Sequence, residues 1–246
     1  MSRLPKAAVV LAAGKGKRMK SDLPKVLHPI HGRPMISILM DTLHSMTFEQ
    51  IAVVIGYKGE MVLKALSDYP VTFVWQTEQL GTGHAVMMAE PELKDFRGTV
   101  LVAAGDVPFL SPKSISRLFE IHESTAAAAT CLSAVVDDPT GYGRIIRVDN
   151  SDQLARIVEH KDADQATLQI REINTGTLCF DASLLFSTLR LLKNDNAQGE
   201  YYLTDCVKIL HEQGRRVSVV CADDSNEVLG VNSVDQLRDL ERRFTR

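Results

Sequence analysis

A glycine turn surrounded by cations is the first stretch of this sequence whose residue types suggest chemistry. Residues 12–25, AAGKGKRMKSDLPK, hold Gly14 and Gly16 and set five lysine or arginine side chains against the single acid Asp22. The turn directly follows the apolar run at residues 7–13. Glycines leave backbone amides accessible and cations neutralise an anion, so the turn predicts a polyphosphate site. A solvated basic loop is the alternative, and it explains the lysines better than the glycines.

Two general nucleotide-binding motifs do not fit this turn. The dinucleotide-binding pattern needs a third glycine where Met19 stands, and the phosphate loop of ATPases ends in Gly-Lys-Ser/Thr after a longer loop. The turn therefore matches neither of these two motifs.

Polar residues also follow two later apolar runs. The segment QTEQLGTGH, residues 76–84, follows the run at 71–75, and Asp106 follows the run at 99–104. The carboxyl ends of parallel strands meet at one edge of a sheet, so we expect both to lie beside Gly14. A carboxylate there suits magnesium, which prefers oxygen ligands. The alternatives are a helix cap at Asp106 and a polar helix start with turn glycines at 76–84.

Strands and helices must alternate to position these residues. Apolar runs predict buried strands at 7–13, 51–55, 71–75 and 99–104, and helical spacing predicts helices at 34–46, 61–66, 83–88 and 112–124. This rhythm predicts an α/β, Rossmann-like fold with a parallel sheet.

The pattern changes after residue 125. Strand-like segments at 126–136, 144–148, 154–160 and 172–180 predict a smaller mixed or antiparallel region laid against the first, followed by helices at 182–192 and 202–213, a strand at 217–222 and a helix at 234–243. We expect one catalytic domain over residues 1–232, with a first lobe at about 1–125 and a second at about 126–232. We expect residues 233–246 to form a helix and the possible start of a linker arm.

Composition narrows the class of protein. The 246 residues are 45% hydrophobic and 24% charged, with a net charge of −3, which is typical of a soluble chain and argues against nucleic acid as a partner. The four cysteines have no metal-ligand spacing and predict neither a zinc site nor a disulfide framework. No leader and no membrane-spanning run is visible, so we expect no membrane partner and a cytoplasmic location.

Six separated motifs carry a resemblance to a known family. They are LAAGKGKRMKSDLPK, QTEQLGTGHA, DDPTGYGRI, IVEHKDA, EINTGTLCF and NAQGEYYLTD. Together they resemble the sugar nucleotidyltransferases, in particular the uridylyltransferase half of the bacterial bifunctional enzymes that make UDP-N-acetylglucosamine. The resemblance implies a mostly parallel mixed sheet of nucleotide-diphospho-sugar transferase type with a smaller sugar-binding lobe. It implies magnesium-dependent in-line attack of N-acetylglucosamine 1-phosphate on UTP, giving UDP-N-acetylglucosamine and pyrophosphate.

The resemblance also assigns site residues. Arg18 and Lys25 are the implied catalytic cations, and Asp106 and Asn232 are the implied Mg²⁺ ligands. By the resemblance, Gln76 and Gly81 recognise the uracil base, and Gly143, Glu159 and Asn174 bind the sugar. The other implied substrate contacts are Leu11, Ala12, Ala13, Gly14, Gln79, Thr82, Ala104 and Gly105. Ala104 departs from the family, which usually has tyrosine there, so only its backbone is expected to contribute.

Several alternatives stay open from the sequence. Glu159 and His160 together suggest an acid/base pair, but neighbours on a strand point to opposite faces, so we do not expect them to act together. His28, His31 and His84 are expected to pack or hydrogen-bond within loops. The rival functions are a glucose 1-phosphate nucleotidyltransferase and a non-catalytic sugar-nucleotide sensor. We expect no acetyltransferase in this chain and leave open whether it is part of a bifunctional enzyme. An oligomer is possible but not predicted.

Overall fold

The apolar runs of the sequence form the strands of one large sheet. The computed structural model describes residues 4–149 and 151–244. Its strands are β1 (Lys6–Ala12), β4 (Gln50–Ile55), β5 (Thr72–Trp75), β6 (Thr99–Ala104), β7 (Ala129–Val135), β8 (Arg144–Arg147), β9 (Leu154–Val158), β10 (Glu172–Asp181) and β11 (Val217–Cys221). A separate short hairpin joins β2 (Pro29–Ile30) to β3 (Arg33–Pro34).

The sheet has nine strands, and seven of them follow the order β11-β7-β10-β6-β1-β4-β5. β1 lies parallel to both β4 and β6, and β5 and β11 are also parallel to their neighbours. β10 is antiparallel to β6 and β7, and it also pairs with β8 at one position. The predicted α/β class with a mostly parallel mixed sheet is confirmed.

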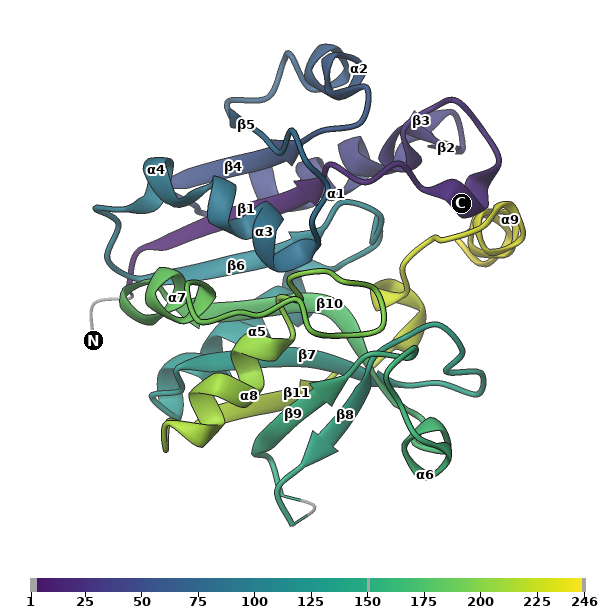
Figure 1. The fold of residues 1–246 in the computed structure, drawn as a ribbon. Coiled ribbons are helices and arrows are strands. Elements are labelled where there is room, and N and C mark those ends of the chain that lie inside the picture. The colour runs from purple at the N-terminus through teal and green to yellow at the C-terminus, as the bar shows by residue number, and fades with distance from the viewer. Residues whose placement is uncertain (1–3, 150, 245–246) are drawn as a thin grey trace.

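Helices cover both faces of this sheet (Figure 1). They are α1 (Met35–His44), α2 (Gly59–Ala65), α3 (Thr82–Met88), α4 (Glu90–Leu93), α5 (Pro112–Ser124), α6 (Gln165–Leu168), α7 (Ala182–Leu189), α8 (Asp205–Glu212) and α9 (Val234–Arg243). Alternate residues of β1 point to opposite faces, because side chains alternate along a strand. Ala7 and Val9 pack in a core with α3, α4, α7 and α8, whereas Ala8 and Val10 pack in a second core with α1, α2 and α5.

The second half of the chain differs from its sequence-based description in one respect. Its strands β7, β10 and β11 do not form a region laid against the first sheet but continue it, because β10 pairs with β6. Among the described strands of this sheet, β8 and β9 form a hairpin that stands off the main path. Hydrophobic periodicity shows that a segment is a strand but not which strand it pairs with, so the continuous sheet was not visible in the sequence.

Some element ends also differ. The strand predicted from residue 126 begins at Ala129, because Ala126 has a left-handed φ of 49° in the turn after α5. The helix predicted from residue 202 begins at Asp205. The strand predicted to residue 160 ends at Val158, so Glu159 and His160 lie just beyond it. The β2–β3 hairpin, α4, α6 and three short 3₁₀ helices were not predicted.

Within residues 4–149 and 151–244, no helix combines the length and the apolar character that crossing a membrane requires.

Candidate active site

The glycine turn lies at the carboxyl end of β1, as its position in the sequence predicts. Gly14 is exposed, and a Cβ added there would meet no atom within 4 Å, so its backbone is open to a ligand. Gly16 has a φ of 65°, and its added Cβ would lie 2.6 Å from the Cβ of Lys25. The turn therefore needs glycine at 16 to let Lys25 pass close to the backbone.

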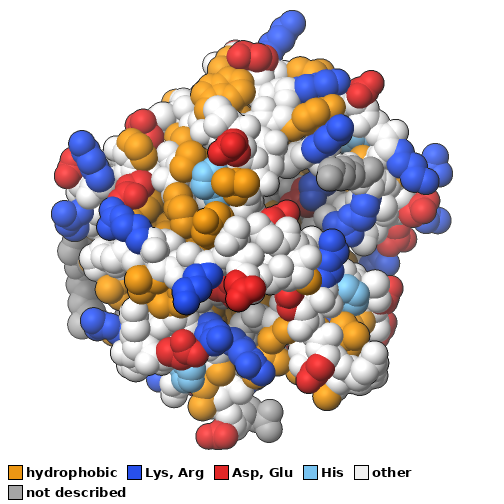
Figure 2. Space-filling model, viewed as in Figure 1, with side chains coloured by type: hydrophobic (Ala, Val, Ile, Leu, Met, Phe, Trp, Pro, Cys, Tyr) orange, Lys and Arg blue, Asp and Glu red, His pale blue; other side chains and the backbone are white. Residues whose placement is uncertain are grey.

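Lys25 connects residues from three distant parts of the chain. Its Nζ forms an ion pair with the Asp106 carboxylate and donates a hydrogen bond to Asn232 Oδ1 at 3.1 Å. Arg18 Nη2 donates to the same Asn232 oxygen at 2.8 Å. Asp106 is only 9% exposed, so these groups meet at the floor of the site. Figure 2 shows a hollow right of centre on this side of the molecule, with Lys and Arg side chains along its rim.

Backbone contacts hold the acidic and amide oxygens in place. The Val231 amide donates to the Asp106 carbonyl at 2.9 Å, which ties the end of β6 to the segment before α9. The backbone amide of Asn232 donates to Gln236 Oε1 at 2.8 Å, and the Ser233 side chain caps the amino end of α9. The first turn of α9 thereby fixes the position of Asn232.

The remaining cations of the turn do not all converge on this point. The Nζ of Lys15 lies 5.1 Å from the centroid of the Tyr57 ring, a cation–π contact. Lys20 is exposed. The side chain of Lys17 lies outside the described part of the structure. Among those of the predicted cations whose side chains the structure describes, Arg18 and Lys25 contact Asn232.

The predicted contacts at the ends of β1 and β6 lie side by side. Leu11 is the register partner of Ala104, and the Gly105 amide donates to the Leu11 carbonyl at 2.9 Å. An added Cβ at Gly105 would lie 2.9 Å from that carbonyl oxygen. Ala12 ends β1, and the Ala13 carbonyl accepts from the Tyr57 amide at 3.0 Å. These contacts form the floor between the glycine turn and Asp106.

The segment after β5 is held by its own side chains. Gln76 is 3% exposed, and its Nε2 donates to the Gly81 carbonyl at 3.0 Å and contacts His84 Nδ1 at 3.0 Å. Gln79 Nε2 donates to the Gln76 carbonyl at 3.0 Å. Gly56 allows this arrangement, because its added Cβ would lie 2.8 Å from the Gln76 carbonyl oxygen and 2.9 Å from Gln79 Nε2.

The same segment contacts the second half of the chain. The Tyr201 amide donates to the Leu80 carbonyl, and the Gly83 amide donates to the Tyr201 carbonyl, both at 2.8 Å. Thr82 Oγ1 accepts from the Leu203 amide at 3.1 Å. These three hydrogen bonds join residues 80–83 to residues 201–203 and so connect the two predicted lobes.

Glu159 and Gly143 lie together in the second half of the chain. An added Cβ at Gly143 would lie 3.5 Å from both carboxylate oxygens of Glu159. Thr204 Oγ1 donates to Glu159 Oε1 at 2.9 Å. Burial is the main cause that raises the pKa of Glu159; Asp205, Asp162 and Glu200 also raise it, and the Thr204 hydroxyl opposes the shift. The polar partner of Glu159 is thus Thr204 and not its neighbour His160.

Asn174 lies at a bulge of β10. The register of β10 with β7 shifts between Asn174 and Thr177, and Gly176 there has a φ of 79°. The Gly176 amide donates to Asn174 Oδ1 at 3.0 Å, and the Asn174 amide donates to the Gly143 carbonyl at 2.9 Å. The added Cβ of Gly176 would lie 3.4 Å from the Cβ of Ala104. This bulge therefore brings the second half of the chain to the end of β6.

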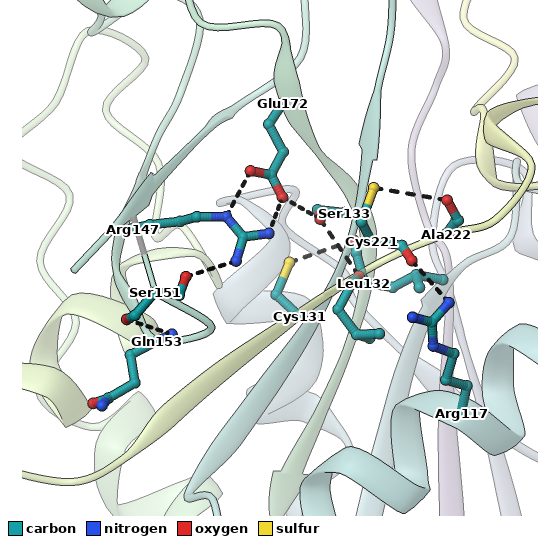
Figure 3. Close-up of polar contacts among 11 residues, drawn as sticks. Arg117, Cys131, Leu132, Ser133, Arg147, Ser151, Gln153, Glu172, Cys221 and Ala222 are labelled. Carbon is teal, nitrogen blue, oxygen red and sulfur yellow. Dashed lines mark hydrogen bonds and ion pairs between the residues drawn. The ribbon is translucent and has the colours of Figure 1, made fainter. Parts of the chain in front are cut away.

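A polar network supports this bulge from β7, β8 and β10 (Figure 3). Arg147 donates to both carboxylate oxygens of Glu172, at 2.8 and 2.6 Å. Ser133 Oγ donates to the same carboxylate at 2.6 Å. A two-pronged guanidinium–carboxylate pair fixes geometry as well as charge, so Glu172 is a rigid start for the strand that carries Asn174.

Three further residues contribute to the site: packing or hydrogen bonding was expected of His84, whereas Thr204 and Tyr142 were not singled out from the sequence. His84 and Thr204 hold Gln76 and Glu159, and the Tyr142 hydroxyl donates to the Gly230 carbonyl at 3.2 Å. All three lie inside or beside the recognised motifs, and that position was their only signal. Their partners depend on how loops meet in space, which no spacing rule in the sequence encodes.

The metal prediction concerns a small ligand set. Over residues 4–149 and 151–244, no group of three or more His, Cys, Asp or Glu side chains is arranged to hold a metal ion. Asp106 and Asn232 offer one carboxylate and one amide oxygen, which suits magnesium because this ion completes its coordination shell with water and substrate phosphates.

A cavity of about 570 Å³ lies elsewhere, at the amino ends of β4 and β5, with Phe48 among its lining residues. Ligands of parallel sheets bind at the opposite edge.

Comparisons with known proteins show which proteins this chain is similar to. The chain matches the family model of the MobA-like NTP transferase domain over residues 8–198. It is 50% identical over 236 residues to the bifunctional protein GlmU of Heliobacterium modesticaldum, a match that covers 96% of this chain and 51% of that protein. It is 51% identical over 234 residues to the bifunctional protein GlmU of Brevibacillus brevis, covering 95% and 50%. The chain spans about half the length of these curated relatives.

Solved structures show the same fold. A UDP-glucose pyrophosphorylase in complex with UDP-glucose has a TM-score of 0.76 at 18% identity, and the match covers 98% of both chains. A nucleotidyl transferase from Methanothermobacter thermautotroptrophicus has a TM-score of 0.65 at 21% identity, covering 98% of this chain and 97% of that one. The predicted nucleotide-diphospho-sugar transferase fold is thereby confirmed.

Proposed function

We propose that this chain, which belongs to the family of MobA-like NTP transferase domains, makes UDP-N-acetylglucosamine. In the proposed reaction, UTP and N-acetylglucosamine 1-phosphate give UDP-N-acetylglucosamine and pyrophosphate. The observation that carries the proposal is the meeting of Lys25, Asp106 and Asn232 beside the glycine turn. The six family motifs and the identity of about half with the GlmU proteins support the choice of base and sugar.

The proposed chemistry is an in-line transfer. A phosphate oxygen of the sugar phosphate attacks the α-phosphorus of UTP, a new P–O bond forms, and the bond to the β-phosphate oxygen breaks to release pyrophosphate. Such transfers depend on positioning and charge neutralisation and need no protein nucleophile. In our proposal Arg18 and the backbone from Gly14 hold the outgoing pyrophosphate, and Lys25 exchanges its ion pair with Asp106 for the reacting phosphates.

We propose Asp106 and Asn232 as the ligands of Mg²⁺. Both side chains already direct an oxygen at one positive charge, the ammonium of Lys25, so the pair fits a hard cation. Bound there, the ion would neutralise negative charge on the phosphates of both substrates. Arg18, which also donates to Asn232 Oδ1, keeps that oxygen oriented toward the site.

The base and sugar contacts follow from the hydrogen bonds that are already made. In the proposal, Gln76, Gly81, Gln79 and Thr82 surround the uracil end of UTP. The Oδ1 of Asn174 is occupied by the Gly176 amide, which leaves its NH₂ group to donate to the N-acetyl carbonyl. Glu159 accepts from sugar hydroxyls beside Gly143. The four cysteines are free thiols, which suits a reducing compartment, so we place the protein in the cytoplasm.

The proposal is tested by pyrophosphate release with UTP, dTTP or CTP and the 1-phosphates of N-acetylglucosamine, glucose and galactosamine. We expect turnover to be highest with UTP and N-acetylglucosamine 1-phosphate. A plain hexose leaves the Asn174 amide unpaired in a desolvated pocket, which costs about 1–3 kcal/mol. Equal turnover with glucose 1-phosphate would contradict the assigned sugar. If no pair of substrates releases pyrophosphate, the proposed activity is wrong.

Removal of divalent ions is expected to abolish this turnover. With EDTA in excess, the phosphates of the two substrates repel each other without a counter-charge, and we expect the rate to fall at least about 100-fold. Added Mg²⁺ should restore it. The control is the melting temperature with and without EDTA, which should not change. Full activity in EDTA would contradict the proposal that Asp106 and Asn232 hold a metal ion that turnover requires.

Replacing Glu159 by glutamine is expected to stabilise the protein and weaken sugar binding. The raised pKa of Glu159 means that the folded protein binds its proton more tightly than the unfolded chain does. Stability therefore falls as the pH rises from the ordinary Glu pKa of about 4.3 through the raised one. We expect E159Q to melt at a higher temperature than wild type at pH 7.5, with the difference shrinking toward pH 4. The KM for the sugar phosphate should rise about ten-fold.

The matched control for this variant is E120Q, which changes an exposed residue of α5. It should leave both the melting temperature and the KM unchanged. A drop in the melting temperature of E159Q at pH 7.5 would show that the ionised carboxylate stabilises the fold, contrary to its raised pKa.

A further inference from the structure

The carboxamide of Gln76 is held in one orientation by two acceptors. Its nitrogen is 3.0 Å from the Gly81 carbonyl oxygen and 3.0 Å from His84 Nδ1. A carbonyl oxygen can only accept, and the same oxygen also accepts from the Ala85 amide at 3.1 Å. The amide atom that faces Gly81 must therefore be the NH₂ group.

This orientation fixes the protonation of His84. The second hydrogen of the Gln76 NH₂ group points at Nδ1, which must accept it, so the ring is neutral and carries its proton on Nε2. Both amide hydrogens of Gln76 are then engaged inside the protein. A ligand beside this buried side chain meets only its oxygen, Oε1.

An amide oxygen distinguishes between pyrimidine bases. Uracil has an N–H donor at its ring nitrogen between two carbonyl groups, whereas cytosine has a bare nitrogen there, which is an acceptor. Oε1 accepts from the first and faces a lone pair of the second. To donate to cytosine, the Gln76 amide would have to rotate by half a turn, break both hydrogen bonds and set its oxygen against the Gly81 carbonyl oxygen, and the His84 ring would have to move its proton from Nε2 to Nδ1 to pair with that oxygen.

We propose that His84 is a positioning residue that sets the preference for uracil over cytosine nucleotides, by holding the Gln76 carboxamide with its oxygen toward the base. The inference rests on the proposed function and deepens it. In this proposal His84 controls base selectivity by fixing the orientation of Gln76, whose carboxamide contacts the base.

Two variants of His84 separate this role from packing. H84L removes the acceptor, whereas H84N keeps one, because Asn Oδ1 and His Nδ1 are both attached to Cγ. We expect H84L to lower the ratio of kcat/KM for UTP to that for CTP about five-fold, since rotation of Gln76 then breaks one hydrogen bond fewer. H84N should keep the wild-type ratio, and in both variants the KM for N-acetylglucosamine 1-phosphate should not change.

A second measurement needs no variant to be active. The ¹⁵N shifts of the His84 ring, assigned by their loss in H84N, should show a neutral ring protonated at Nε2. A ring protonated at Nδ1, or an unchanged UTP to CTP ratio in H84L, would overturn the role of His84 while the proposed function stands. If the wild-type protein turns over no UTP, the proposed function fails, and this inference fails with it.

Discussion

Replacing Lys25 by alanine is expected to lower turnover at least about 100-fold while the fold remains intact, because the residue supplies preorganised positive charge where negative charge moves during transfer. In the ligand-free structure its Nζ joins Asp106 to Asn232, and its side chain is largely buried at the floor of the site. Steady-state pyrophosphate release at saturating substrates measures the effect. Circular dichroism and the melting temperature report the fold.

K58A is the matched control for this variant. Lys58 also lies near the glycine turn, but its Nζ donates to the Asp22 carbonyl at 2.7 Å and makes no contact with Asp106 or Asn232 among the described residues. We expect K58A to keep turnover within about two-fold of wild type. Near-normal turnover in K25A would remove Lys25 from the proposed mechanism.

Replacing Gly81 by alanine is expected to destabilise the protein by about 2–4 kcal/mol and to abolish nucleotide binding. Gly81 has φ and ψ of 112° and 175°, a region that glycine alone adopts without strain. Its added Cβ would also lie 2.6 Å from the Tyr201 carbonyl oxygen and 2.8 Å from the Tyr201 amide nitrogen, and backbone atoms on both sides cannot give way cheaply. Urea denaturation and calorimetric titration with UTP measure the two effects.

G199A separates backbone strain from collision. Gly199 also has a positive φ, 66°, but an added Cβ there meets nothing within 4 Å. It should cost only about 1 kcal/mol and leave UTP binding intact, because it strains the backbone without pushing two segments apart. Equal losses in both variants would show that the contact of Gly81 with Tyr201 is not a tight one.

The fold was predictable where local patterns decide it. Apolar runs predicted β6 and β4 almost to the residue, and the helices predicted at 112–124 and 234–243 match α5 and α9. The position of β10 was not predictable, because its antiparallel insertion between β6 and β7 depends on pairing across the sheet and on the bulge at Gly176. The short β2–β3 hairpin lacks any run long enough to give a periodic signal.

The site was predictable in part, for a similar reason. The rule that ligands bind at the carboxyl edge of parallel strands brings Gly14 and Asp106 together, and the structure has them at that edge. Asn232 was assigned only through the resemblance to the family, since nothing local marks it. Lys15 was expected beside the phosphates but lies over Tyr57, because a long flexible side chain chooses its partner from the three-dimensional surroundings.

The last helix has a consequence for when the candidate site is completed during synthesis of the chain. Met19 of the glycine turn packs with Val231 and with Leu240 of α9, and Arg18 and Lys25 reach Asn232 across more than 200 residues of sequence. Figure 1 shows α9 beside the loops that follow β1. A nascent chain emerging from the ribosome can assemble the parallel half of the sheet early, but it has no complete anion cradle until residue 232 has left the exit tunnel. A polypeptide that ends short of that point lacks the Asn232 oxygen to which Arg18 and Lys25 donate, and under the proposed function we expect it to be inactive.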